Sequence, residues 1–247
     1  MILRAIRKVR DGLVASVYPE QCRMCGQAVE SYDDGVACRD CWLDSSITRL
    51  ITDPACPKCA TPLGTSSDRQ HCDSCQSLPF SVARACAVYS GAIEASILFL
   101  KVQPHVCRRL RVIIAQTYSK HSAALENDMV VPIPLHRSRE QERGFNQARV
   151  IAKMICSDFR LNLDDRLLVR VKRTQRHRAG FDAKDRARSV ERAFEVPRPA
   201  QVRDARVLLV DDVFTTGSTI ASATKALLDC GAARVSVFTI ARVPVKA

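Results

Sequence analysis

The sequence predicts an α/β protein in which a mainly parallel sheet is flanked by helices and preceded by a small cysteine-rich module. After residue 78, strand-like apolar runs alternate with segments of helical periodicity, a pattern typical of βαβ units and a parallel sheet. Before residue 78, eight of the 12 cysteines are concentrated in a short segment. The 247 residues, 47% of them hydrophobic, suffice for one well-buried domain and a small module.

The first segment, residues 1–21, is predicted to be an amphipathic helix. Apolar residues recur at helical spacing between Ile2 and Val17, and basic residues occupy the other positions of the turn: Arg4, Arg7, Lys8 and Arg10. This helix packs on its own protein or, alternatively, lies on the surface of the inner membrane. The segment lacks the continuous apolar core of a signal peptide, and no run approaches the roughly 18 apolar residues of a membrane span, so we expect a reducing, cytoplasmic location.

Residues 22–78 contain an internal repeat of Cys-x-x-Cys pairs. Each copy consists of a pair, 12 intervening residues and a second pair, and is too small to fold by apolar burial alone. Two such pairs supply four thiolates to a tetrahedral, structural zinc ion. The sequence therefore predicts a double zinc ribbon with two ions. The first is bound by Cys22, Cys25, Cys38 and Cys41, and the second by Cys56, Cys59, Cys72 and Cys75. An interleaved pairing of the four pairs remains open.

The four remaining cysteines have no partner pair. They lie in apolar or helical contexts and are interpreted as small core residues: Cys86, Cys107, Cys156 and Cys230. His71 adjoins Cys72, but the four-sulfur set is complete without it.

Residues 79–247 are predicted to form the α/β domain. A strand-like run begins this region at residues 77–91, and later strands are expected at residues 129–133, 167–171, 207–210 and 235–240. Helices are expected at residues 92–101, 106–125, 146–159 and 218–230, the last ended by Gly231 as a helix-terminating glycine.

The segment from Val207 to Thr219 has the pattern of an anion site. Four apolar residues precede two carboxylates, Asp211 and Asp212, and then the run Thr215, Thr216, Gly217, Ser218 and Thr219. The amides and hydroxyls of this run can surround a phosphate at the positive end of a helix that begins near Ser218, and Gly217 permits close approach. The carboxylates would repel a phosphate, so hydroxyl groups or a magnesium ion are their expected partners.

Basic residues give the chain a formal net charge of +12, which favours polyanions such as nucleotide phosphates, nucleic acid or an anionic membrane. They are dense between residues 160 and 192, where few apolar residues occur after residue 172. We interpret residues 172–190 either as a solvated surface segment or as a lid over the anion site.

The segment from Val207 to Thr219 resembles the phosphoribosyl pyrophosphate (PRPP) loop of type I phosphoribosyltransferases. This resemblance implies that Asp211 and Asp212 bind the ribose 2- and 3-hydroxyls, that Thr215 to Thr219 bind the 5-phosphate, and that Mg²⁺ accompanies PRPP. The segment from Val130 to Ala148, together with the doubled Cys-x-x-Cys ribbon, resembles the ComF and GntX family. That resemblance implies a pyrophosphate-side loop formed by Pro132, Ile133, Pro134 and Leu135, with Arg137 and Arg143 as charges beside it.

Some positions depart from the family pattern. His177 occupies the place of the usual glutamine in a Thr-x-x-Gln element at Thr174, Ser189 replaces a common asparagine, and a Leu-Lys-aromatic element survives only as Leu100, Lys101 and Val102. These departures concern the second substrate and catalysis rather than PRPP binding.

Three functions are compatible with these features. The resemblance to ComF implies a PRPP-binding cytoplasmic protein that handles single-stranded DNA during DNA uptake. A phosphoribosyltransferase with an unidentified, nucleobase-like acceptor and a non-catalytic PRPP sensor are the alternatives, because one scaffold carries both catalytic and regulatory proteins.

Overall fold

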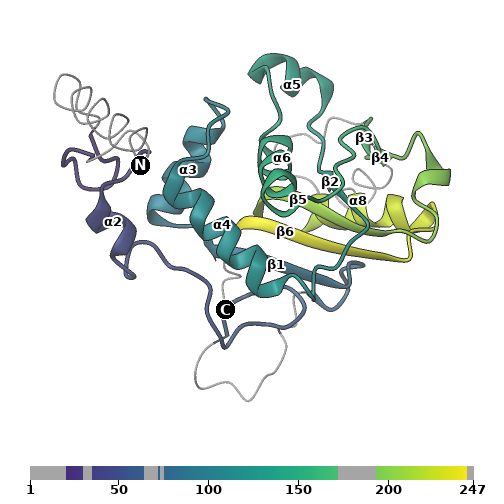
Figure 1. Ribbon diagram of the computed structural model, residues 1–247, viewed down its shortest axis with the longest axis horizontal. Coiled ribbons are helices and arrows are strands. Elements are labelled where there is room, and N and C mark those ends of the chain that lie inside the picture. Colours follow the sequence, from purple (N-terminus) through teal and green to yellow (C-terminus); the bar gives the residue numbers. More distant parts are fainter. Residues whose placement is uncertain (1–20, 30–34, 64–71, 73–74, 172–192, 244–247) are drawn as a thin grey trace, which may run out of the picture.

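The computed structural model describes residues 21–29, 35–63, 72, 75–171 and 193–243 (Figure 1). The expected N-terminal helix at residues 1–21 lies outside the described residues except for Gln21, as does the basic segment 172–190. Among the helices of the described ranges, none combines the length and the apolar character that crossing a membrane requires.

The main sheet is parallel, as predicted, and contains four of the five expected strands. They are β1 (Val82–Val88), β6 (Arg234–Arg242), β5 (Arg206–Phe214) and β2 (Met129–Pro132), in that spatial order. The strands are almost continuously apolar because both faces of the sheet are covered.

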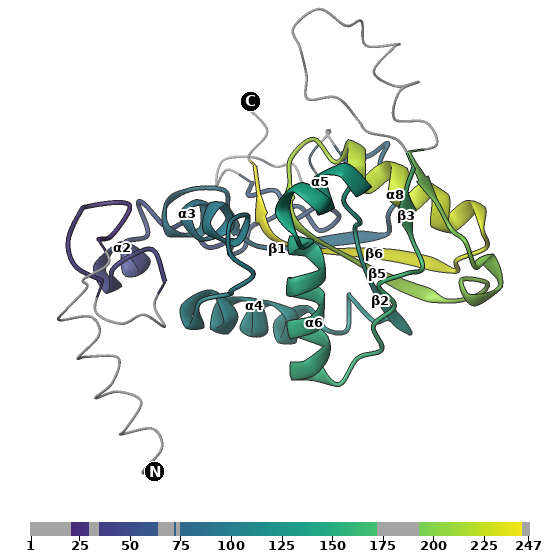
Figure 2. The same ribbon diagram turned by 90° about the horizontal axis from the view of Figure 1, so that it is seen from above.

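Helices cover both faces of this sheet, as seen in Figure 2. On one face lie α4 (Arg108–His121) and α6 (Gln147–Phe159), and α3 (Gly91–Leu100) contributes to the same buried cluster. On the other face lies α8 (Ser218–Asp229), which ends, as predicted, just before Gly231 in the left-handed region at φ 92°.

One expected strand was assigned to the wrong sheet, and the short helix α5 (Arg137–Arg143) was among the elements that the sequence did not indicate. Residues 167–171 contain only β3 (Val169–Arg170), which pairs antiparallel with β4 (Phe194–Glu195) in a separate two-stranded sheet. Leu167 and Leu168, the apolar residues of the expected strand, are buried, but they lie before β3 and do not take part in its pairing with β4. Helix α5 buries no residue, so it has no apolar periodicity by which the sequence could indicate it.

The described parts of the ribbons pack against the sheet domain. The first includes the short helix α2 (Arg39–Leu43), and the backbone amide of Ile51 and the carbonyl of Arg49 bond to β1. In the second ribbon the carbonyl of Lys58 accepts a hydrogen bond of 2.6 Å from the amide of Ala83. Cysteines of the first ribbon share a buried cluster with α4 and α6, and those of the second share one with α8. Backbone hydrogen bonds therefore cross the expected domain boundary near residue 78.

Candidate functional site

Two groups of four cysteines form candidate metal centres. Their Sγ atoms lie within 4.8 Å of one another in each group, Cys22, Cys25, Cys38 and Cys41 in one and Cys56, Cys59, Cys72 and Cys75 in the other. The sequential pairing is therefore correct and the interleaved pairing is wrong.

The spacing of the sulfurs suits zinc. The Sγ–Sγ distance is 3.6 Å for Cys25 and Cys38, and in the second group the distances run from 3.2 Å for Cys59 and Cys72 to 3.7 Å for Cys56 and Cys75. A tetrahedral ion with Zn–S bonds of about 2.3 Å requires sulfurs about 3.8 Å apart. Four thiolates leave no open coordination position, so these centres are structural.

Three of the four cysteines outside the ribbons are core residues, as predicted. Cys86, Cys107 and Cys156 are buried, and Cys230 packs partly buried against α8's side of the sheet. Burial raises the pKa of the Cys86 thiol to about 12 and that of Cys156 to about 11. These thiols are therefore protonated and unreactive at neutral pH.

The anion motif and the pyrophosphate-side loop meet at one edge of the sheet. Because β2 and β5 are parallel neighbours, with Pro132 opposite Val210, both loops leave the carboxyl edge side by side. The amide of Ile133 donates to the carbonyl of Val210 at 2.9 Å, which holds the start of one loop against the other strand. Ligands of open parallel sheets bind at this edge.

The phosphate motif has the expected strand, turn and helix. Gly217 precedes α8 with φ 82°, in the left-handed region that glycine adopts without penalty. Thr215, Thr216 and Ser218 are exposed, and the Thr216 hydroxyl lies 3.1 Å from that of Ser218. The amides and hydroxyls at the start of this 12-residue helix can therefore reach a phosphate from solvent.

The two carboxylates of the motif have different neighbours. β5 continues through both residues to Phe214, beyond the predicted end at Val210, so successive side chains leave opposite faces of the strand. Asp212 lies 3.9 Å from the ammonium of Lys101, just beyond the end of α3. Burial, and then the charge of Asp212, raises the pKa of Asp211 well above its ordinary value.

The pyrophosphate-side loop is positioned by buried Asn146. Its Nδ2 donates to the carbonyl of Ile133 at 3.0 Å, and its Oδ1 accepts from the amide of Ala148 at 3.0 Å as the cap of α6. Asn146 and Gln147 thus begin the helix as predicted. Pro132 and Ile133 are buried, while Pro134 and Leu135 are partly exposed.

Arg137 and Arg143, the arginines expected beside the pyrophosphate-side loop, differ in environment. Arg137 is exposed at the start of α5, and Arg143 donates to the side chain of Gln147 at 2.9 Å. Two other arginines, Arg139 and Arg170, were not singled out as pyrophosphate-side residues. Burial and the charge of Arg139 lower the pKa of Arg170, whereas the carboxylate of Asp211 raises it, so Arg170 lies within electrostatic reach of both groups. Their proximity depends on β3 and α5 folding over the sheet edge, for which the sequence offers no local signal.

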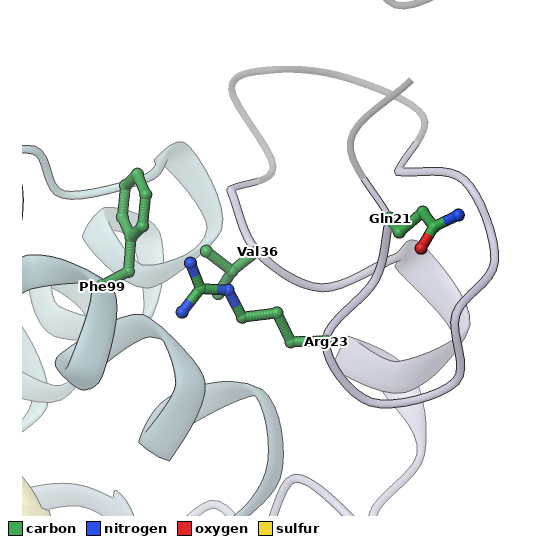
Figure 3. A pocket seen from close by; sticks show the side chains of 4 residues that line it. All are labelled: Gln21, Arg23, Val36 and Phe99. Atoms are coloured by element: carbon green, nitrogen blue, oxygen red, sulfur yellow. The ribbon is translucent and has the colours of Figure 1, made fainter. Parts of the chain in front are cut away.

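A small cavity lies between the first ribbon and α3 (Figure 3). It has a volume of about 220 Å³ and is lined by Gln21, Arg23, Val36 and Phe99, with the Arg23 guanidinium 5.5 Å from the centre of the Phe99 ring. None of its lining residues belongs to the phosphate or pyrophosphate-side motifs.

Comparison with known families matches two regions of the chain. Residues 13–76 match the double zinc ribbon domain, and residues 100–247 match the phosphoribosyl transferase domain.

Named relatives share most of the chain. Competence protein F of Haemophilus influenzae is 28% identical over 76% of this chain and 85% of its own length. DNA utilization protein YhgH of Salmonella typhi is 30% identical over 76% of this chain and 83% of its own. Among solved structures, glutamine PRPP amidotransferase from B. subtilis, with ADP and GMP, has 20% identity and a TM-score of 0.35. That match covers 53% of this chain and 25% of the other.

Proposed function

Because the chain belongs to the ComF family, with a double zinc ribbon before a phosphoribosyl transferase domain, we propose that it binds PRPP with Mg²⁺ and handles single-stranded DNA during DNA uptake. The observation that carries PRPP binding is the meeting of the carboxylate pair, the phosphate motif and the pyrophosphate-side loop at one sheet edge. A cytoplasmic location fits this function.

In this proposal each part of PRPP has its own partners. The ribose hydroxyls donate to Asp211 and Asp212, and the amides and hydroxyls of Thr215 to Thr219 hold the 5-phosphate. The loop from Pro132 to Leu135 lies beside the pyrophosphate. Arg170, which lies within electrostatic reach of Asp211, and its neighbour Arg139 supply positive charge to the pyrophosphate. Mg²⁺, if bound together with PRPP, would neutralise part of the charge of the pyrophosphate beside this loop.

Single-stranded DNA is the proposed macromolecular partner because the names of two relatives refer to competence and to DNA utilization. The net charge of +12 favours a polyanion. The first candidate contacts are Lys172, Arg173, Arg176 and Arg178, and the second are Arg4, Arg7, Lys8 and Arg10, all outside the described residues.

PRPP binding is tested by the thermal midpoint with and without PRPP and Mg²⁺. A ligand that binds only the folded state raises the midpoint by mass action, and Asp211→Asn with Asp212→Asn should abolish the increase. The control is Asp164→Asn with Asp165→Asn, which removes the same charges from an adjacent pair bonded to Arg198 and Arg149. An increase that survives in the first double variant would show that the carboxylate pair does not bind the ligand.

DNA binding is tested by salt titration of a labelled single strand. Affinity should fall by about 0.7 log unit per log unit of salt for each phosphate contact. Neutralising the four residues Lys172, Arg173, Arg176 and Arg178 should reduce this slope. Neutralising arginines already in ion pairs, Arg111, Arg198 and Arg206, should have a smaller effect. Absence of binding at low salt would refute the DNA function while leaving PRPP binding intact.

Transfer of ribose 5-phosphate to a nucleobase-like acceptor is the second candidate. Tyr89 favours it, because burial and then the charges of Glu94 and Asp212 raise the pKa of this phenol, so a half-buried aromatic group lies within electrostatic reach of Asp212. In such a transfer the acceptor nitrogen forms a bond to the anomeric carbon as the bond to pyrophosphate breaks. Pyrophosphate release that depends on an added nucleobase, and that decreases in Tyr89→Ala, would establish this activity.

A further inference from the structure

Arg242 is a buried cation between the second ribbon and the strand that carries the phosphate motif. It is the last residue of β6, is 2% exposed, and lies opposite Phe214 of β5. Its Nε donates to the Thr61 hydroxyl at 2.6 Å, and its guanidinium carbon lies 3.8 Å from the centre of the Phe214 ring. One side chain therefore contacts both parts of the protein.

Thr61 continues this contact to a zinc ligand. Its hydroxyl oxygen lies 3.0 Å from the Sγ of Cys59, and its carbonyl accepts from the amide of Cys56 at 2.8 Å. Since the oxygen accepts the Nε–H of Arg242, the hydroxyl proton is free to point at the Cys59 thiolate. Such hydrogen bonds to metal ligands orient the ligands and adjust their charge.

Charge balance also connects Arg242 with the second zinc centre. A buried guanidinium is costly unless an opposite charge or hydrogen bonds compensate it, and within the described residues its Nη1 has no hydrogen bond. Four thiolates on one Zn²⁺ carry a formal net charge of about −2. The loaded centre therefore supplies, through Thr61, the negative charge that a cation at this position requires.

Phe214 is in turn the support of the phosphate motif. A Cβ at Gly217 would lie 2.6 Å from the Phe214 ring and 3.0 Å from the Cδ1 of Leu78, so the turn rests directly on both side chains. The Phe80 ring meets Phe214 edge to face at 5.7 Å. Lys58, between the zinc ligands Cys56 and Cys59, donates to the carbonyl of Leu78 at 2.8 Å. A shift of the second ribbon would therefore move both supports of Gly217.

We propose that Thr61 and Arg242 are positioning residues that couple the second zinc centre to the phosphate motif, so that the zinc-loaded ribbon holds this motif in its ligand-binding shape. The inference rests on the proposed PRPP site. If these residues were only packing elements, Thr61→Val, which keeps the shape and removes the hydroxyl, would leave PRPP affinity unchanged.

The test measures zinc per chain and the Kd of PRPP with Mg²⁺ in the full-length protein. Thr61→Val should raise the Kd about tenfold, the equivalent of about 1.4 kcal/mol, whereas Thr61→Ser, which keeps the hydroxyl, should match the wild type. Arg242→Met should raise the Kd at least as much. Arg23→Met is the matched control, because Arg23 places its cation over Phe99 from the first ribbon (Figure 3) and should not affect the Kd.

Zinc release provides a second readout. Coupling between two sites is reciprocal, so PRPP with Mg²⁺ should slow the release of one of the two zinc ions to a chelator in the wild type. This protection should be lost in Thr61→Val. Wild-type affinity in Thr61→Val, or equal losses in the Val and Ser variants, would overturn the coupling while leaving PRPP binding established. A wild type that does not bind PRPP would instead refute the proposed function, and the coupling with it.

Discussion

Gly217→Ala should destabilise the protein more than Gly231→Ala, the same substitution at the other end of α8, because two separate penalties act at Gly217. Its φ of 82° lies in the left-handed region, which costs an L-residue about 1–2 kcal/mol. The new methyl group would also lie 2.6 Å from Phe214 and 3.0 Å from Leu78, and forcing an extra methyl group into a packed site costs about 1–3 kcal/mol. The free energy of unfolding should therefore fall by about 2–5 kcal/mol.

Gly231→Ala separates the two penalties. Gly231, at the other end of α8, has φ 92°, but a Cβ there would meet its nearest atoms at 3.7 Å, an ordinary contact distance. In thermal unfolding, where about 1 kcal/mol corresponds to 2–4 °C for a chain of this size, the control should lose about 2–8 °C and Gly217→Ala about 4–20 °C. Only Gly217→Ala should also reduce the stabilisation by PRPP with Mg²⁺. Equal losses in the two variants would refute the close packing under the phosphate motif.

Three further predictions concern the ribbon, the pyrophosphate-side loop and pH. Wild-type protein should carry two zinc ions, and the Cys56→Ser variant should carry one. This variant should also have a less stable sheet domain, because Cys56 shares a buried cluster with α8. An unchanged unfolding midpoint of the sheet domain would contradict this expectation. Asn146→Ala should cost about 1–3 kcal/mol by urea unfolding and weaken PRPP binding, and Asn146→Asp should retain the helix cap but still destabilise the protein, because it places a buried carboxylate oxygen against the carbonyl oxygen of Ile133. In the folded protein without ligand, the pKa of Asp211 is raised above its unfolded value of about 4. The protonated carboxyl group therefore contributes to stability below about pH 4, and this contribution is lost as the pH rises through the folded pKa. Asp211→Asn should remove this dependence, and PRPP affinity should rise over the same interval as the carboxylate ionises.

The sequence alone determined the features that depend on local spacing. Two cysteines three residues apart can bind one ion from a single turn, so the Cys-x-x-Cys pairs identified the metal ligands. The apolar strand, carboxylates and Thr-Thr-Gly-Ser-Thr run likewise indicated a strand, a turn at Gly217 and a helix, and the structure contains all three. Periodicity also predicted the four parallel strands and the helices that cover them.

The tertiary structure decided which distant residues meet. Equal spacing in both ribbon copies could not choose between sequential and interleaved pairing, whereas the Sγ positions did. Nor could the sequence place Arg170 near Arg139 and Asp211, or Lys101 near Asp212, because these groups are brought together when separate elements converge on one sheet edge. Arg242 contacts Thr61 across 181 residues of chain. Local periodicity reports whether a residue faces a core, but only the packing of the whole chain determines which residue it meets there.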